Sequence, residues 1–376
     1  MPERWSADEL KTLLQIVPRL PGTQDGVGDY ALNLAQALAR QFNTETIFAV
    51  PHATAKQVGA FAVRSFDLSD ASGAGLAQDC EDVLLHYVNY GYHVRGVPRR
   101  LPGFLQTLRQ NSGLRMSVIF HELFAEVRAP WRSAFWLKPL QIRIAREIAA
   151  LADVCFVSGE VMAGQLQRIT QPARISIHPV MSNFGEPVLS TGDFATRDPH
   201  RWVICGGTAL VARSVRSFAA RLGEIPEVFS PRELFVLGGR ADDSIQADLA
   251  RLRGLKVKYF PEIEASEASR ILSSCSFGWL DYFHETRALV GAVLKSTAFA
   301  AYCAHGVIPV FPHAGSSIQV RHDRMPGPFS VGESEQDLPS EAGRAQVAQS
   351  LYDWYQRNAS SQHLAATVHS AMGQPA

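Results

Sequence analysis

Short apolar runs alternate with helical patterns along this chain, and they do so in two separate series. The first series has five runs of strand length, at residues 12–18, 46–51, 82–88, 116–122 and 152–158. The second has five more, at residues 201–207, 232–239, 255–261, 275–281 and 306–312. Strands that alternate with helices are typical of parallel sheets covered by helices on both faces. The sequence therefore predicts an α/β protein built on two sheets.

The stretch between the two series is rich in Gly, Pro, Asp and Ser and has no helical period, as expected of an interdomain linker. We expect an N-terminal domain over 1–185, a linker over 186–200 and a second domain over 201–335. A C-terminal helical segment is expected over 336–376, with an amphipathic helix at 345–358. The length of 376 residues is consistent with two domains.

Charge and cysteine usage exclude several classes of protein. Lys plus Arg and Asp plus Glu both total 36, so the chain lacks the polyelectrolyte character that favours nucleic acid. The five cysteines form neither a disulfide framework nor a zinc pattern, and Cys155, Cys205 and Cys275 lie in apolar runs typical of buried residues. No signal peptide is evident, and no apolar run reaches the ~18 residues of a membrane span. We therefore expect a cytoplasmic protein in a reducing compartment.

The stretch LPGTQDGVGDY, residues 20–30, lies between the first apolar run and a helical pattern. Glycines at such a turn let a ligand approach the backbone, and the free N–H groups of a helix start favour an anion. The stretch is neither a P-loop nor a GxGxxG motif. We expect Gly26, Gly28 and Tyr30 to line a ligand site and Asp29 to cap a helix beginning at the next residue. A plain strand-to-helix turn is the alternative.

Polar residues follow the third and fourth runs of the first series. Asn89 and Tyr90 lie in a predicted loop, HYVNYGYH, whose hydrogen-bonding aromatic groups suit a sugar or a peptide. His121 ends the next run, at the edge where open α/β sheets bind ligands, and it could bond a ligand or move a proton. A surface loop and a structural histidine are the alternatives. His121 and Glu122 lack the second histidine of a zinc motif.

Glycines and basic residues follow the strands of the second series. A guanidinium beside the N–H groups of a helix start suits a diphosphate. A lysine at a helix start opposes the helix dipole, which an anion bound there would explain. Surface arginines and simple strand ends are the alternatives. The candidate donor-binding residues of this kind are Gly207, Arg213, Arg216, Arg240, Lys295 and Ser296.

Together these stretches resemble glycosyltransferases of the GT-B fold, in particular the retaining family 4. DGVGDY, which supplies Gly26, Gly28, Asp29 and Tyr30, is similar to the family's Gly-Gly-Val-Gly-like loop, and His121 matches its mid-domain histidine. In the second domain GGTALVARS has Thr208 where Arg is usual and Arg213 where Lys is usual. AHGVIPV resembles the helix–Gly–strand element that closes this domain in the family. The resemblance covers roughly residues 12–320. It implies two Rossmann-like domains facing a deep cleft.

The resemblance also implies an activity. The protein would move a sugar from a nucleotide-diphosphate sugar to a saccharide or lipid-linked acceptor, with retention, in glycan or exopolysaccharide biosynthesis. The second domain would bind the donor. The loop at residues 20–30, together with Asn89 and Tyr90, would bind the acceptor, and His121 would contact the transferred sugar. Cationic groups and the N–H groups of a helix start can stabilise the departing diphosphate without a metal, and the sequence shows no convincing DxD-like metal site, so we expect no metal and no other cofactor.

One departure from the family concerns its Glu-x7-Glu element. The two corresponding positions are Val293 and Ala301, neither of which is acidic. Glu285 is the upstream candidate for one of the two catalytic roles, and Lys295 with Ser296 for a phosphate contact. The departure keeps open a non-catalytic nucleotide-sugar-binding or scaffold protein. A Rossmann oxidoreductase is the weakest alternative, because GxGxxG is absent.

Residues 123–146 combine aromatic side chains with five basic ones: Arg128, Arg132, Lys138, Arg143 and Arg146. Such a surface could make a peripheral contact with an anionic membrane, where lipid-linked acceptors lie. The alternative is an ordinary helix pair with buried tryptophans and a solvated basic face. The sequence favours this alternative slightly.

Overall fold

The computed structural model describes residues 11–21, 26–70, 73, 75–125, 130–282, 290–332 and 338–373. The chain forms two compact units, one of Met1–His178 with Ser361–Ala376 and one of Pro179–Ser360. Glu285 lies outside the described residues. These boundaries differ from the expected ones, because the last helix belongs to the first unit and not to a separate C-terminal segment.

The first unit is built on an eight-stranded sheet in the order β3-β4-β2-β1-β5-β6-β7-β8. Every pairing is parallel except that of β3 with β4. The strands are β1 Lys11–Ile16, β2 Thr44–Pro51, β3 Gln57–Val58, β4 Phe61–Phe66, β5 Asp82–Tyr87, β6 Arg115–Phe120, β7 Val154–Val157 and β8 Ile175–Ile177. Helices on both faces require the central strands to be apolar on both sides, as the sequence pattern predicted.

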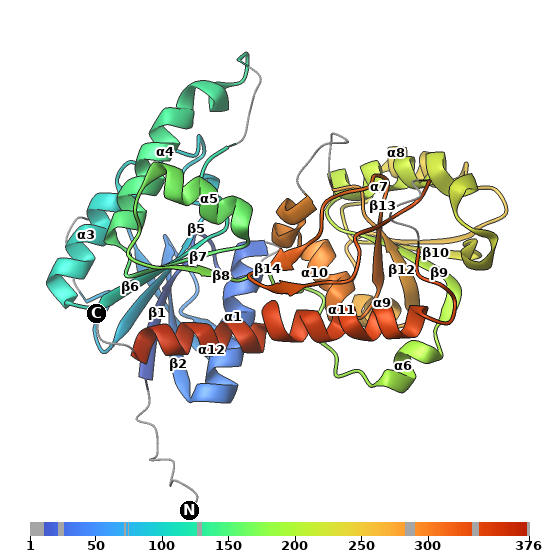
Figure 1. The fold of residues 1–376 in the computed structure, drawn as a ribbon. Helices are drawn as coiled ribbons and strands as arrows, with labels where there is room; N and C mark the ends of the chain where they lie inside the picture. The colour runs from blue at the N-terminus through green and yellow to red at the C-terminus, as the bar shows by residue number, and fades with distance from the viewer. Residues whose placement is uncertain are drawn as a thin grey trace, which may run out of the picture. The chain divides into compact units, whose positions relative to one another are not determined.

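Two layers of helices cover this sheet. The helices of the unit are α1 Gly26–Phe42, α2 Asn89–Tyr92, α3 Leu101–Ser112, α4 Ser133–Leu151, α5 Glu160–Ile169 and α12 Ser361–Gly373. One hydrophobic core joins the sheet to α3, α4 and α5, and another joins its opposite face to α1. The C-terminal helix α12 returns to lie along α1 (Figure 1).

The second unit has a six-stranded parallel sheet in the order β11-β10-β9-β12-β13-β16. Its strands are β9 Asp198–Cys205, β10 Glu233–Leu237, β11 Lys256–Phe260, β12 Cys275–Trp279, β13 Ile308–Phe311 and β16 Phe329–Ser330. A separate antiparallel pair is formed by β14 Gln319–Val320 and β15 Asp323–Arg324.

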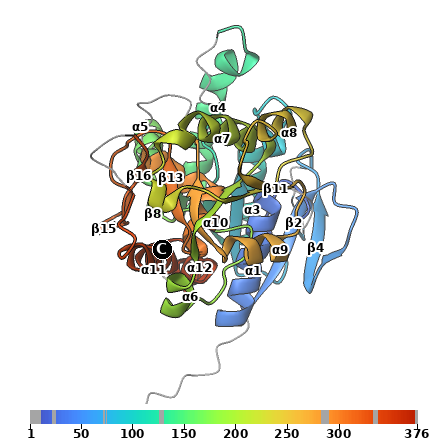
Figure 2. The ribbon, with the colours of Figure 1, turned by 90° about the vertical axis from the view of Figure 1, so that its right-hand side faces the viewer.

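The helices of the second unit are α6 Thr191–Ala195, α7 Thr208–Arg221, α8 Asp243–Leu249, α9 Ala265–Leu272, α10 Thr297–Ala304 and α11 Arg344–Asn358. Short 3-10 turns lie at Leu222–Glu224, Glu227–Phe229 and Val290–Lys295. Helices α7 and α8 cover one face, and α9 and α10 lie on the other (Figure 2).

Both sheets reverse their strand order beside their first strand. In the first unit β1 lies between β2 and β5, and in the second β9 lies between β10 and β12. Loops leave a sheet in opposite directions at such a point, which opens a crevice outside the carboxyl ends of the strands. Each unit is therefore Rossmann-like, and its topology locates one position for a ligand.

Three local predictions are corrected by the structure. Helix α1 begins at Gly26, so Asp29 lies in its first turn and is not its N-cap, although a carboxylate there still suits the helix dipole. Asn89 and Tyr90 belong to the helical turn α2 and not to a loop. The predicted linker contains α6, which a capping box between Ser190 and Asp193 starts. The linker prediction failed because five helical residues are too few to show a period.

Candidate functional site

A row of buried polar side chains crosses the reversal point of the first sheet. Gln15 on β1 and His86 on β5 are both fully buried in strands whose other residues are mostly apolar. Leu14 and Ile16 pack into the core beneath α3, α4 and α5. Because side chains alternate along a strand, Gln15 points to the opposite face, and so does His86 between Leu85 and Tyr87. Both therefore lie on the face that α1 covers.

Hydrogen bonds join this row into one chain, which we call the polar track: Thr46, Gln15, His86 and His121. Nε2 of His121 lies 3.2 Å from Nδ1 of His86, and Nε2 of His86 lies 2.8 Å from Oε1 of Gln15. The amide nitrogen of Gln15 in turn lies 3.5 Å from the Thr46 hydroxyl. The track thus runs from β2 through β1 and β5 to the end of β6.

His121 is the end of the track nearest the carboxyl edge of the sheet. Its backbone N–H donates to the Tyr87 carbonyl at 2.9 Å, which fixes the residue directly after β6. Tyr30 of α1 lies edge-on to the His121 ring, with 4.9 Å between ring centroids, and edge-on to His86. Burial lowers the pKa of His121 to about 4 and holds the pKa of His86 well below its usual value. Both imidazoles are therefore neutral at pH 7.

Gly26 and Gly28, both in the first turn of α1, have different surroundings. A Cβ on Gly28 would lie 3.1 Å from Cα of Pro21 and 3.2 Å from the Leu20 carbonyl oxygen, so the chain leaving β1 packs directly against the start of α1. Gly26 is exposed at the first position of that helix. Gly28 accordingly allows a close backbone contact, while Tyr30 is buried against the two histidines.

The helical turn α2 follows β5 at the same edge. Asn89 is fully buried; its Oδ1 accepts from the Tyr90 N–H, and its Nδ2 has no hydrogen-bond partner among the residues that the structure describes. Tyr90 is 39% exposed. The Tyr92 hydroxyl lies 3.2 Å from the Ile16 carbonyl and 3.1 Å from that of His86, so it ties β1 to β5 where the strand order reverses.

In the second unit the loops after β9 and β10 meet at the start of α7. Gly207 is the N-cap residue of this helix. A Cβ on Gly239 would lie 2.9 Å from Cα of Thr208, and the Arg240 N–H donates to the Thr208 hydroxyl at 2.8 Å. Two of the predicted donor-binding residues, Gly207 and Arg240, therefore meet beside the free N–H groups of a 14-residue helix.

Arg213, also on α7, is bonded to the chain that leaves β12. Its Nε donates to the Asp281 carbonyl at 2.6 Å, and Nη2 donates to that of Tyr282 at 3.2 Å. The same Nε lies 3.6 Å from the Asp281 carboxylate. The guanidinium therefore bridges the reversal point of the second sheet and anchors this segment, while Arg216 is exposed one turn further along the helix.

The remaining predicted residues of this unit lie at the start of α10. Ser296 is the buried N-cap residue, and its hydroxyl accepts from the Phe299 N–H at 3.3 Å. Lys295, directly before it, is exposed. Val293 and Ala301, which stand where the resembled family has glutamates, are fully buried. The hydroxyl of Ser296 thus has a capping role.

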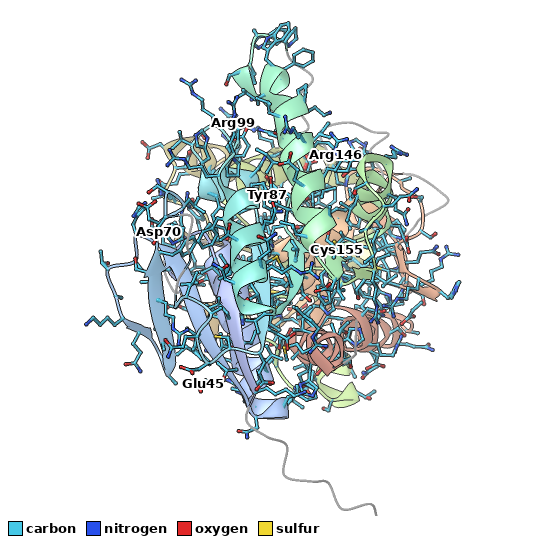
Figure 3. The ribbon with its side chains drawn as sticks, turned by 90° about the vertical axis from the view of Figure 1, so that its left-hand side faces the viewer. Glu45, Asp70, Tyr87, Arg99, Arg146 and Cys155 are labelled. Carbon is cyan, nitrogen blue, oxygen red and sulfur yellow. The ribbon has the colours of Figure 1, made fainter. Side chains whose placement is uncertain are left out.

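The tryptophans of the basic aromatic stretch are not buried, so the interpretation that the sequence slightly favoured is wrong. Trp131 is 84% exposed and Trp136 is 70% exposed. The first buried residue of α4 is Gln141, and Leu137 and Leu140 before it are partly buried against the core, whereas Phe135 and Trp136 in the first turns are exposed. These turns extend beyond the rest of the first unit (Figure 1), and Arg146 lies further along the same helix (Figure 3).

Two cavities of the described part of the chain lie apart from the predicted site residues. One of about 370 Å³ is lined by Arg64, Asp67 and Phe104, and one of about 320 Å³ by Asp193, Arg197 and Arg201. Over the described ranges, no cluster of three or more His, Cys, Asp or Glu could hold a metal ion. No helix in that part of the chain is long and apolar enough to cross a bilayer.

Several solved structures match this chain over nearly its whole length. An alpha-glucosyltransferase (AGT) in complex with UDP matches with a TM-score of 0.58 and 12% identity, over 97% of this chain and 100% of that chain. AviGT4, a glycosyltransferase involved in avilamycin A biosynthesis, matches with a TM-score of 0.54 and 15% identity, over 97% of each chain. A putative UDP-N-acetylglucosamine 2-epimerase from Listeria monocytogenes matches with a TM-score of 0.53 and 10% identity, over 98% of each.

No protein-family model matches the chain, and no curated protein sequence matches it. At 10–15% identity a structural match establishes the fold and leaves the chemistry open. With a parallel sheet in each unit and these matches over almost the full length, the chain has the GT-B fold, with two Rossmann-like domains.

Proposed function

We propose that this protein is a glycosyltransferase that moves a sugar from a nucleotide-diphosphate sugar to a saccharide or lipid-linked acceptor. The observation that carries the proposal is His121, which lies at the carboxyl end of β6 in a GT-B fold and is held by buried polar groups at the reversal point of its sheet. A parallel sheet keeps polar side chains in its interior at a cost, so such a row indicates a role other than packing. In this proposal the track supports a sugar contact by His121, and a purely structural histidine is the alternative.

The second unit would hold the donor. The start of α7 offers free N–H groups beside Gly207, and the exposed cations Arg216, Arg240 and Lys295 belong to the same unit. Such groups stabilise a departing diphosphate without a metal ion. Metal independence, retention and a role for Glu285 are parts of the proposal. Retention and the role of Glu285 rest on the sequence resemblance, and metal independence rests on the cationic groups of this unit.

Product analysis with a panel of UDP-, GDP- and ADP-linked sugars tests the proposal. A donor that binds the folded protein raises its melting temperature. We then expect release of the nucleotide diphosphate, unchanged by a chelator and strongly reduced in His121→Ala. Binding without turnover would favour the non-catalytic nucleotide-sugar-binding protein, and formation of an epimerised nucleotide sugar would favour the chemistry of the Listeria neighbour. If no donor binds, the proposal fails.

We also propose that the start of α4 contacts an anionic lipid surface. Trp131, Phe135 and Trp136, which we call the aromatic tip, are all exposed, and Arg132 lies among them. Further along the helix Arg146 is exposed, and Arg143 is partly neutralised by Glu147 at 2.7 Å. Amphipathic aromatic rings beside cations suit the interface of an anionic membrane, and exposed apolar clusters mark interaction sites. A lipid-linked acceptor would be reached from such a surface.

Sedimentation with vesicles that contain phosphatidylglycerol tests this contact. Wild type should sediment with the vesicles at low salt, and its tryptophan emission should shift to the blue, because Trp202, Trp279 and Trp354 are already buried. Replacing all three residues of the aromatic tip by Ser should abolish sedimentation. Val94→Ser is the matched control, since Val94 is 89% exposed in the same unit. Equal sedimentation of tip variant and control would contradict the proposal, as would no binding by wild type.

A further inference from the structure

We infer that the polar track sets the direction of all its hydrogen bonds, so that His121 presents a bare Nδ1 to the ligand as a hydrogen-bond acceptor. His86 and Gln15 are then positioning residues, which act through His121. The identity of the ligand as a sugar rests on the proposed function, but the direction of the bonds does not.

The direction follows from the Gln15 end of the track. The amide oxygen of Gln15 can only accept, so His86 must carry its proton on Nε2, 2.8 Å away. A neutral imidazole has one N–H, which leaves Nδ1 of His86 as an acceptor. Nε2 of His121, at 3.2 Å from that nitrogen, must then donate. The single proton of a neutral His121 is therefore directed into the protein.

The structure places the oxygen of the Gln15 amide towards His86 and its nitrogen towards a second contact. Nε2 of Gln15 lies 3.5 Å from the hydroxyl of Thr46, which is fully buried, so the nitrogen faces β2 and the oxygen faces β5. Every donor in the track then points away from the carboxyl edge, from His121 to His86, to Gln15 and to Thr46. Because Gln15 and His86 are also fully buried, water cannot replace a partner that is lost.

The other nitrogen of His121 is open to a ligand. The described contacts of the residue are the Nε2 bond to His86, the ring edge of Tyr30 and the backbone bond to Tyr87. Within the described part of the chain, Nδ1 has no hydrogen-bond partner. The half-buried His121 thus offers one lone pair at the carboxyl edge of β6.

This polarity selects a class of ligand group. A hydroxyl can donate to Nδ1, whereas a fluorine or a methyl ether cannot, and an anionic oxygen would be repelled by the lone pair. A neutral His121 also has no proton on this side to give to a leaving group. His121 therefore accepts a hydrogen bond from a sugar hydroxyl. It contributes to substrate specificity and does not serve as a general acid.

Tautomers of the histidines in the intact protein test the inference without any turnover. Long-range nitrogen–proton NMR spectra of histidine-labelled protein, assigned with His→Gln variants, distinguish a protonated from a bare ring nitrogen. His86 and His121 should both carry the proton on Nε2. His305 is an internal reference of the opposite kind, because its Nδ1 faces the Ala301 carbonyl at 2.7 Å and its Nε2 faces the Ser269 hydroxyl at 2.8 Å. A proton on Nδ1 of His121 would overturn the inference.

A variant series tests whether the track controls specificity. Wild type should prefer a donor over its deoxy or O-methyl analogue at one hydroxyl by about tenfold in kcat/KM, the effect of one hydrogen bond. His121→Leu should abolish this preference, and His86→Leu should weaken it. His86→Gln should restore it, since an amide can accept from His121 and donate to Gln15. The control His305→Gln, in the other unit, should keep it.

If no analogue distinguishes wild type from His121→Leu, the specificity role is wrong even where turnover is normal. If turnover is absent with every donor but the tautomers are as expected, the proposed function fails and the direction of the track stands. A His86→Leu protein that does not fold is replaced by Gln15→Met, which removes the acceptor of His86 at similar volume.

Discussion

The two units have the same central strand order, but they place their polar groups differently. In the first unit the polar groups lie inside the strands, as Gln15 on β1 and His86 on β5. In the second unit the buried polar residues of β10 and β12, Glu233 and Ser276, lie near the starts of these strands. The polar groups at the carboxyl ends come instead from the loops and helices that follow, as with Gly207 and Arg213. Topology thus fixes where a ligand site can form, and the residues at the strand ends decide which groups form it. We call the first unit's site, with Gln15, His86 and His121, the side-chain site. We call the second unit's site, at the start of α7 beside Gly207 and Gly239, the backbone site.

The largest expected effect is on the side-chain site. His86→Leu leaves Oε1 of Gln15 and Nε2 of His121 without partners in a buried setting, which should lower the free energy of unfolding by about 3 kcal/mol. Urea unfolding measures this change, and His86→Gln should cost clearly less. A loss below about 0.5 kcal/mol in the Leu variant would mean that the track is not a connected unit.

The backbone site of the second unit should be sensitive to a single methyl group. Gly239 has a φ of +73°, and its Cβ would meet Cα of Thr208 at 2.9 Å, so Gly239→Ala should cost about 2 kcal/mol and weaken nucleotide-sugar binding. Gly254→Ala is the matched control, because its φ is +82° and no atom lies within 4 Å of the added Cβ. Equal losses in the two variants would show that only backbone conformation matters and that the contact with α7 does not.

A smaller effect is expected from Arg213. Arg213→Ala removes its bonds to the Asp281 and Tyr282 carbonyls, which should cost about 1–2 kcal/mol in thermal or urea unfolding and reduce turnover. Arg213→Lys keeps the charge but lacks the separate N–H donors by which the guanidinium reaches both carbonyls. We therefore expect it to behave more like the Ala variant than like wild type. Wild-type turnover in Arg213→Lys would instead support a direct charge contact with the donor. Arg251→Ala is the surface control, because the Arg251 side chain is 77% exposed.

The last prediction, which has no effect at neutral pH, concerns pH and compares His121 with His305. Burial lowers the pKa of each to about 4, below the ordinary value of 6.5, so the unfolded chain takes up protons that the folded chain does not. Stability should therefore be full above pH 6.5 and fall as the pH decreases towards 4. Replacing either histidine by Gln should reduce this slope by up to about 1.4 kcal/mol per pH unit, the value for one proton. An unchanged slope in His121→Gln would contradict its neutral state.

The architecture could be predicted from the sequence, because parallel strands are apolar runs whose length and spacing are local properties. The polar track could not. Gln15 and His86 each appear as one polar residue in an apolar run, and their contact depends on β5 pairing with β1, which no local pattern encodes. The only sign of the polar track in the sequence is the position of these two polar residues near the ends of their apolar runs.

Two other features depended on packing and not on pattern. Arg213 matched a phosphate-binding position, but its bonds to the segment after β12 follow from the order of strands in the folded unit. Trp131 and Trp136 looked like core residues, yet both are exposed, and the part of α4 that packs on the core begins after them, at Leu137. Composition alone does not reveal where a helix leaves its core.

The release of nucleotide diphosphate from UDP-, GDP- and ADP-linked sugars, compared between wild type and His121→Leu, tests the central claim most directly. We expect wild type to release the nucleotide from at least one donor and the variant to release it at least about tenfold more slowly. We also expect the donor to raise the melting temperature of both proteins. Equal release by both proteins, or no release from any donor by wild type, would contradict the claim.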